Sequence, residues 1–149
     1  MVQEKTADEL IHLTKMIPDL ILNIGELKMS LKPNVEKWSK KEILGHLTDS
    51  AFNNIQRLIR ARYEKLPEII YNADEWVRLQ GYQALPLQEL VNLWTALNRQ
   101  LAFIIGRLNS KELQEKCRAD QEAPASLEFI STDYLKHLKH HLSQIVSLQ

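Results

Sequence analysis

Apolar residues recur at steps of three and four along nearly the whole chain, and this spacing constrains the fold more than any other feature. Such a period places the apolar side chains on one face of an amphipathic helix. Runs that alternate apolar and polar residues, which would indicate β-strands, have no useful length. The sequence therefore predicts an all-α fold. The first apolar stripe comprises Leu10, Leu13, Ile17, Leu20 or Ile21, Ile24, Leu27 and Leu31.

Two long helices are expected in the N-terminal half. The first begins at a capping box formed by Thr6 and Glu9, and Pro18 is expected to kink or split it. The second extends from about residue 40 to about residue 64, because Ser39 and Glu42 form the clearest capping box of the chain.

Two further long helices are expected, over residues 87–108 and from near residue 126 to about residue 146. Between the second and third helices, residues 66–86 are irregular, with a short helical turn at 72–76. Four amphipathic helices of this length predict a four-helix bundle in one domain, residues 1–149. The connection of roughly 20 residues is long enough for a crossover, so a simple up-down-up-down order is not required.

Composition excludes several classes of protein. The 19 Lys and Arg residues balance 19 Asp and Glu residues, whereas a nucleic-acid-binding domain usually carries a basic excess. A single cysteine, Cys117, allows neither an intramolecular disulfide nor a cysteine-rich zinc site. The N-terminus does not resemble a secretory signal, and no apolar run approaches the roughly 20 residues of a membrane span. We therefore expect a cytoplasmic protein that binds neither nucleic acid nor membrane.

The histidines of the last helix point to chemistry. His137 and His141 lie one turn apart on the apolar face, and such a pair can supply two ligands to one metal ion. Two ordinary buried histidines with separate hydrogen-bond partners are the alternative, and the pair alone does not decide between them. His140 falls on the flank of the same helix. A third ligand has to come from elsewhere, and His46, at the border of the second helix's apolar face, is a plausible one.

Two segments resemble the DinB-like superfamily, which includes YfiT-type metal hydrolases and thiol-dependent S-transferases. They are KWSKKEILGHLTDS (residues 37–50) and DYLKHLKHHLSQI (residues 133–145), with a looser match at YNADEWV (residues 71–77) followed by Gly81 and Tyr82. The resemblance implies a four-helix bundle in up-down-down-up order, in which His46, His137 and His141 bind a divalent metal. Dimers are common in this superfamily, so the resemblance also implies a homodimer.

Three histidine ligands leave an open coordination position, which is typical of a catalytic rather than a structural site. Zn or Ni is the expected metal, although imidazole ligands alone do not select one. Asp49 and Asp74 are the candidate catalytic carboxylates. Glu42 lies four residues before His46, and Asp133 lies four residues before His137, so each carboxylate is placed to orient a ligand imidazole. The alternative is that Glu42 only caps its helix and that Asp133 is a solvated side chain.

The sequence thus predicts a metal-dependent enzyme acting on a small molecule. The reaction is either hydrolysis or transfer to a low-molecular-weight thiol, and the sequence does not separate the two. The alternative is a non-enzymatic bundle with a structural metal site, acting in stress response or by binding a partner.

Overall fold

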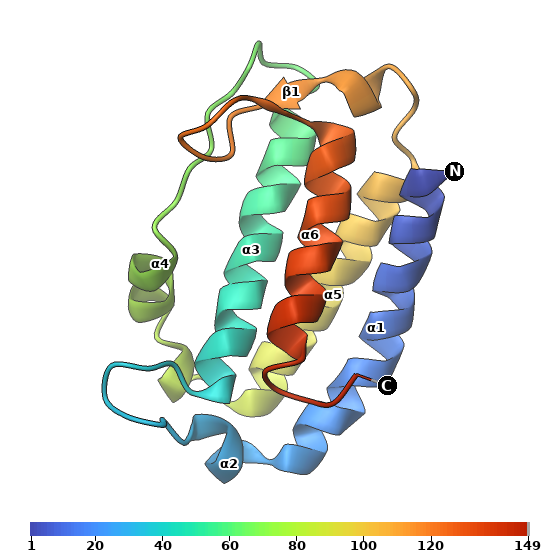
Figure 1. The fold of residues 1–149 in the computed structure, drawn as a ribbon. Helices are drawn as coiled ribbons and strands as arrows, with labels where there is room; N and C mark the ends of the chain where they lie inside the picture. Colours follow the sequence, from blue (N-terminus) through green and yellow to red (C-terminus); the bar gives the residue numbers. More distant parts are fainter. Residues whose placement is uncertain (149) are drawn as a thin grey trace.

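Four long helices run side by side in the computed structural model, which describes residues 1–148 (Figure 1). They are α1 (Val2–Ile24), α3 (Lys40–Arg60), α5 (Leu87–Gly106) and α6 (Leu127–Leu142). Short elements connect them: α2 (Glu26–Ser30), α4 (Ala73–Gln80), the 3-10 turns η1 (Tyr82–Ala84) and η2 (Glu112–Gln114), and the two-residue strands β1 (Lys116–Cys117) and β2 (Ala125–Ser126). The all-α prediction is confirmed, since the strands form only one small antiparallel ladder.

The order of the helices follows from the long connection between α3 and α5. The chain leaves the end of α3, returns along the outside of the bundle through α4, and enters α5 beside the beginning of α3 (Figure 1). Consequently α3 and α5 run in the same direction, while α1 and α6 run in the opposite one. Both α1 and α3 pack against α5 and α6. This is the expected up-down-down-up bundle.

The beginning and the interruption of the first helix differ from prediction. The helix begins at Val2 rather than at Thr6, because buried residues continue upstream, and the Gln3 amide donates to the Leu108 carbonyl at 3.3 Å. It is not split at Pro18, since the fully buried Ile17 and the following turn keep the helix packed. The interruption falls at Gly25, whose φ of 89° is readily adopted only by glycine.

The other boundaries were predicted more closely. Helix α3 begins at residue 40 as expected but ends at Arg60, four residues before the predicted end at 64, and turns follow it. The turn expected at 72–76 extends to Gln80 as α4, capped by the Asn72 side chain. Helix α6 is shorter than expected and ends at Leu142.

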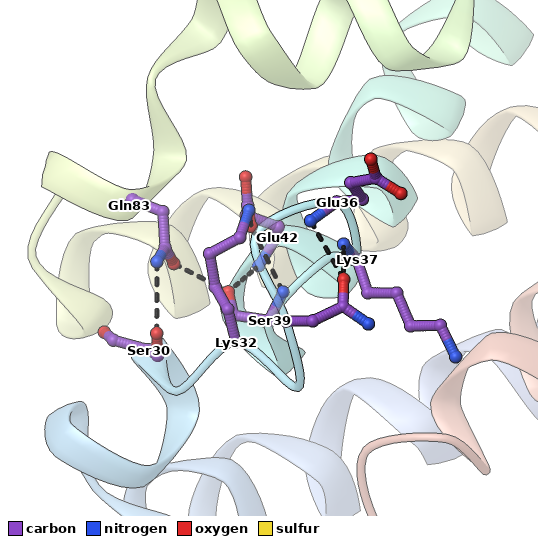
Figure 2. A network of polar contacts seen from close by, with 8 residues as sticks. Ser30, Lys32, Glu36, Lys37, Ser39, Glu42 and Gln83 are labelled. Atoms are coloured by element: carbon purple, nitrogen blue, oxygen red, sulfur yellow. Dashed lines mark hydrogen bonds and ion pairs between the residues drawn. The ribbon is translucent and has the colours of Figure 1, made fainter.

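The start of α3 is held by a network of polar contacts (Figure 2). Ser39 and Glu42 form the predicted capping box, with the Glu42 amide 3.0 Å from Ser39 Oγ. Ser39 Oγ also donates to Gln83 Oε1 at 2.6 Å, and Lys32 Nζ lies 3.0 Å from the Glu42 carboxylate. These contacts hold the beginning of α3, and the Glu42 side chain serves as its cap, with no contact to His46 found among residues 1–148.

The connection between α3 and α5 is also fastened at the other end of the bundle. The Ile69 amide donates to the Arg118 carbonyl and the Arg118 amide to the Pro67 carbonyl, each at 2.9 Å. This pairing brings two segments far apart in the sequence against the α3–α6 face. None of the helices among residues 1–148 is long and apolar enough to cross a membrane.

Candidate metal centre

Three histidines from two helices meet between α3 and α6. Because these helices are antiparallel neighbours, the beginning of α3, with His46, lies beside the end of α6, with His137 and His141. One ring nitrogen of each histidine lies within 4.8 Å of the others. Among the described residues this is the group of His, Cys, Asp or Glu side chains placed to share one metal ion.

The spacing of the α6 pair matches that of two ligands on one ion. His137 Nε2 and His141 Nε2 are 3.1 Å apart. At Zn–N distances of about 2.0–2.1 Å, tetrahedral ligand nitrogens are separated by roughly 3.3 Å. One turn of helix therefore brings both nitrogens into the range that a shared metal ion requires.

His46 is the most enclosed of the three residues, whereas His137 and His141 are half-buried. Its ring lies against Trp38, with centroids 5.0 Å apart, and edge-on to both His137 and His141. Its Nδ1 is buried and has no hydrogen-bond partner among residues 1–148. Such an atom costs free energy unless it finds a partner. A ligand set of three imidazoles with an orphaned buried nitrogen fits a divalent metal ion.

Gln144 orients His141 from outside the cluster. The Gln144 Oε1 atom is 2.9 Å from His141 Nδ1, and an amide oxygen can only accept. Nδ1 therefore carries the proton, which leaves the Nε2 lone pair free for a metal. Gln144 was not among the predicted site residues, although its position three residues after His141 was a signal that could have indicated it.

The cluster favours neutral imidazoles, as metal ligands require. Burial lowers the pKa of His46 to about 4, and neighbouring His137 and His141 act in the same direction. Burial also lowers the pKa of His137, and His141 adds to the effect. The His46 and His137 rings are thus ready to bind a cation at neutral pH without first losing a proton.

The metal-free protein is expected to lose stability on acidification. The unfolded chain protonates His46 near pH 6.5, whereas the folded chain does so only near pH 4. The free energy of unfolding should therefore fall as pH drops from about 6.5 to about 4, by a few kcal/mol at most. Urea unfolding at pH 7, 5.5 and 4.5 measures this slope, and His46→Gln should flatten it. Equal slopes for both proteins would contradict the assignment.

Asp49 is fully buried rather than solvated, and its carboxylate is held by the crossover segment. Asp49 Oδ1 accepts from the Tyr82 hydroxyl at 2.7 Å and from the Gln80 amide at 3.0 Å, whereas Oδ2 is buried with no partner in the described part of the chain. Burial raises the pKa of Asp49, and the two donors oppose that rise. The Tyr82 ring covers Gly45, where a β-carbon would collide with it.

Asp74 is exposed at the start of α4 and lines an open hollow of about 430 Å³ together with His141, Gln144 and Trp38. The remaining candidates lie further out. His140 and Asp133 are exposed on α6, and His12, which was not a candidate, is exposed on α1. Of the two predicted carboxylates, Asp74 thus lines the same open hollow as His141, while Asp49 is enclosed in the protein.

A second hollow, of about 310 Å³, lies on the His137 side of the histidine cluster. His137 lines it, with Tyr134, Tyr71 and Arg57 among the other lining residues. The Tyr134 hydroxyl bonds to Asn98 Oδ1 in the core, so its ring rather than its hydroxyl serves as wall. The cluster can therefore be approached by small molecules from two hollows.

Known proteins of similar sequence and fold carry names that refer to metal. A protein of Halalkalibacterium halodurans named "Putative metal-dependent hydrolase" is 25% identical over 97% of this chain and 86% of its own length. A protein of Oceanobacillus iheyensis with the same description is 25% identical over 95% of this chain and 82% of its own. YfiT from Bacillus subtilis, described as a probable metal-dependent hydrolase with an unusual four-helix bundle topology, superposes with a TM-score of 0.77 at 19% identity, covering 93% and 83% of the two chains.

The match extends to the family level. A sequence model of the DinB superfamily aligns with residues 9–145, which include all three clustered histidines, the whole of α3, α5 and α6, and α1 from residue 9 onward. The chain belongs to the DinB superfamily.

Proposed function

We propose that this protein is a metal-dependent hydrolase whose metal ion is held by His46, His137 and His141. The convergence of three imidazole nitrogens within 4.8 Å carries the proposal. The names of its relatives point the same way. A structural metal site normally uses four protein ligands, so a three-residue cluster favours catalysis. Zn and Ni are the metals we propose, because both accept imidazole ligands.

A bound divalent ion with an open position would supply a Lewis acid that polarises a carbonyl and lowers the pKa of water. The protein's own residues do the rest. Gln144 holds His141 in one tautomer, and Trp38 packs against His46. Asp74, in the hollow that His141 also lines, is the carboxylate we propose as proton acceptor. Asp49, locked by Tyr82 and Gln80, is a positioning residue that fixes the crossover against α3.

Transfer to a low-molecular-weight thiol is the second candidate function. The observation that favours it is the pair of separate hollows, one lined by His137 and one by His141. A hydrolase needs room for one substrate and water, whereas a transferase has to admit two organic molecules. The two functions share the metal site and differ only in the second reactant.

The test is an assay of tag-free protein loaded with Zn or Ni on a panel of carboxylic esters and amides, alone and with a thiol and an aryl halide. We expect hydrolysis that a chelator abolishes and the metal restores. Replacement of His141 by alanine should abolish it, whereas the exposed His12→Ala should leave it unchanged. Activity in the thiol arm alone would favour transfer. Hydrolysis that survives the chelator, or inactivity in every arm, would contradict a metal-dependent enzyme.

A further inference from the structure

A buried arginine lies in the hollow that His137 lines. Arg57, on α3, is only 9% exposed. Its Nε donates to the Ile69 carbonyl at 3.1 Å, and its Nη2 donates to the carbonyls of Ile69 at 2.8 Å and Ala119 at 3.1 Å. The guanidinium is therefore fixed on one edge by backbone carbonyls of the crossover and of the loop before β2.

The opposite edge of the guanidinium is less well satisfied. Within the described residues Nη1 makes a single long contact, 3.4 Å to Asn54 Oδ1, so at least one of its two N–H groups has no acceptor there. Among residues 1–148, Arg57 forms no ion pair with a carboxylate. Burial lowers the pKa of Arg57, although the group stays charged at neutral pH. A buried positive charge is costly unless it is paired, and Asp120 acts on Arg57 only through an electrostatic attraction that opposes the lowering of the pKa by burial.

The surroundings of Arg57 have the size and chemistry of a small-molecule site. The hollow measures about 310 Å³, and its walls include the rings of Tyr71, Tyr134 and Phe129. The Tyr71 ring also faces the guanidinium, 5.6 Å from its central carbon. Arg57 and His137 line the same hollow, so a molecule held by Arg57 would extend toward the histidine cluster.

We propose that Arg57 binds the carboxylate of a small substrate with an apolar body, whose reacting group then lies toward His137. The inference rests on the proposed function in taking the histidine cluster as the reaction centre. Nη1 supplies an N–H donor for the carboxylate, and the hydrogen bonds of Nε and Nη2 to backbone carbonyls hold the guanidinium in place. The aromatic walls would receive the body of the molecule.

The rim of the hollow limits the charge of that substrate. Asp120 and Asp133 also line it, and both are exposed to solvent. Their negative charges would repel a second anionic group near the opening, whereas a carboxylate at Arg57 would be paired with the guanidinium. The site therefore selects a monoanion over a dianion.

The experiment measures binding to metal-free protein, so that no ion can hold the carboxylate. The probes are phenylacetate, its neutral amide phenylacetamide and the dianion phenylmalonate, titrated by calorimetry with ligand-observed NMR as a second readout. We expect phenylacetate to bind at least tenfold more tightly than the other two. Arg57→Gln should remove this preference, and Arg60→Gln, one turn further along α3, should retain it.

Arg57 also fastens two loops, so the folded state of each variant is checked by circular dichroism. If Arg57→Gln does not fold, the affinities for phenylacetate and phenylacetamide are compared in the wild type and in Arg57→Lys instead. Equal binding of acid and amide, absence of binding, tighter binding of the dianion, or an unchanged preference in a folded Arg57→Gln protein would each overturn the proposal.

These outcomes are separable from those of the hydrolysis assay. Phenylacetate binding without any hydrolysis would leave the anion site standing while the proposed function fails. Metal-dependent hydrolysis in a protein that does not distinguish phenylacetate from its amide would support the function and remove the anion site.

Discussion

Replacement of His137 by alanine is expected to lower the affinity for Zn by more than about 100-fold. His137 supplies one of only three clustered nitrogens, and its Nε2 lies 3.1 Å from that of His141. Loss of a residue that merely supports a ligand already costs roughly 10–100-fold in affinity, and loss of a ligand should cost more. Competition with a chromophoric chelator measures the dissociation constant directly.

The matched control is His140→Ala, which removes an exposed histidine from the same turn of α6. It should bind Zn as the wild type does. Because His137 is only half-buried, both variants should fold, and circular dichroism verifies this. Wild-type affinity in His137→Ala, or an equal loss in both variants, would contradict the proposed ligand set.

Gly45→Ala is expected to destabilise the protein by ~1–3 kcal/mol, the usual cost of overpacking a filled site. A β-carbon at this position would collide with Cγ and Cδ2 of Tyr82. The ring would have to move, and its hydroxyl would then leave the buried Asp49 carboxylate. Urea denaturation followed by circular dichroism gives the change in the free energy of unfolding.

Gly106→Ala, at the end of α5, provides the comparison. A β-carbon there would meet only Ala7 Cβ, at 3.3 Å. The higher helix propensity of alanine, worth up to about 1 kcal/mol, works against this tight contact. We expect a change within about 1 kcal/mol of the wild type. If the two variants were equally stable, the close packing of Tyr82 on Gly45 would be contradicted.

The helices were predictable because their signals are local. The apolar period and the Ser39–Glu42 capping box act within a few residues, and both appear in the structure where expected. Pro18 does not split α1, because tertiary packing outweighs the lost hydrogen bond, and the interruption lies at Gly25, where glycine readily adopts a positive φ. The early start at Val2 depends on a contact with Leu108, more than 100 residues away, which no local pattern contains.

In the candidate site, too, some features follow from local sequence spacing and others depend on distant segments. The i, i+4 spacing of His137 and His141 placed them on one face, and the 3.1 Å between their nitrogens is what that spacing produces. His46 was only plausible by spacing, and the family resemblance, not the helical pattern, singled it out. Asp49 could not be recognised as buried, since its partners Tyr82 and Gln80 come from the crossover.

Arg57 is the clearest example of a residue whose surroundings could not be predicted from the sequence. No local pattern on α3 indicates that this side chain is buried, yet its guanidinium donates to the carbonyls of Ile69 and Ala119. Both carbonyls belong to irregular segments, whose paths follow from long-range pairing between residues 67–69 and 118. Secondary-structure patterns carry no information on such paths.

The most direct test of the central claim is the metal content of tag-free protein after incubation with Zn or Ni and removal of excess ion. Elemental analysis by mass spectrometry should find one metal ion per chain, held by His46, His137 and His141. A wild-type protein that is folded yet retains no metal under these conditions would contradict the account.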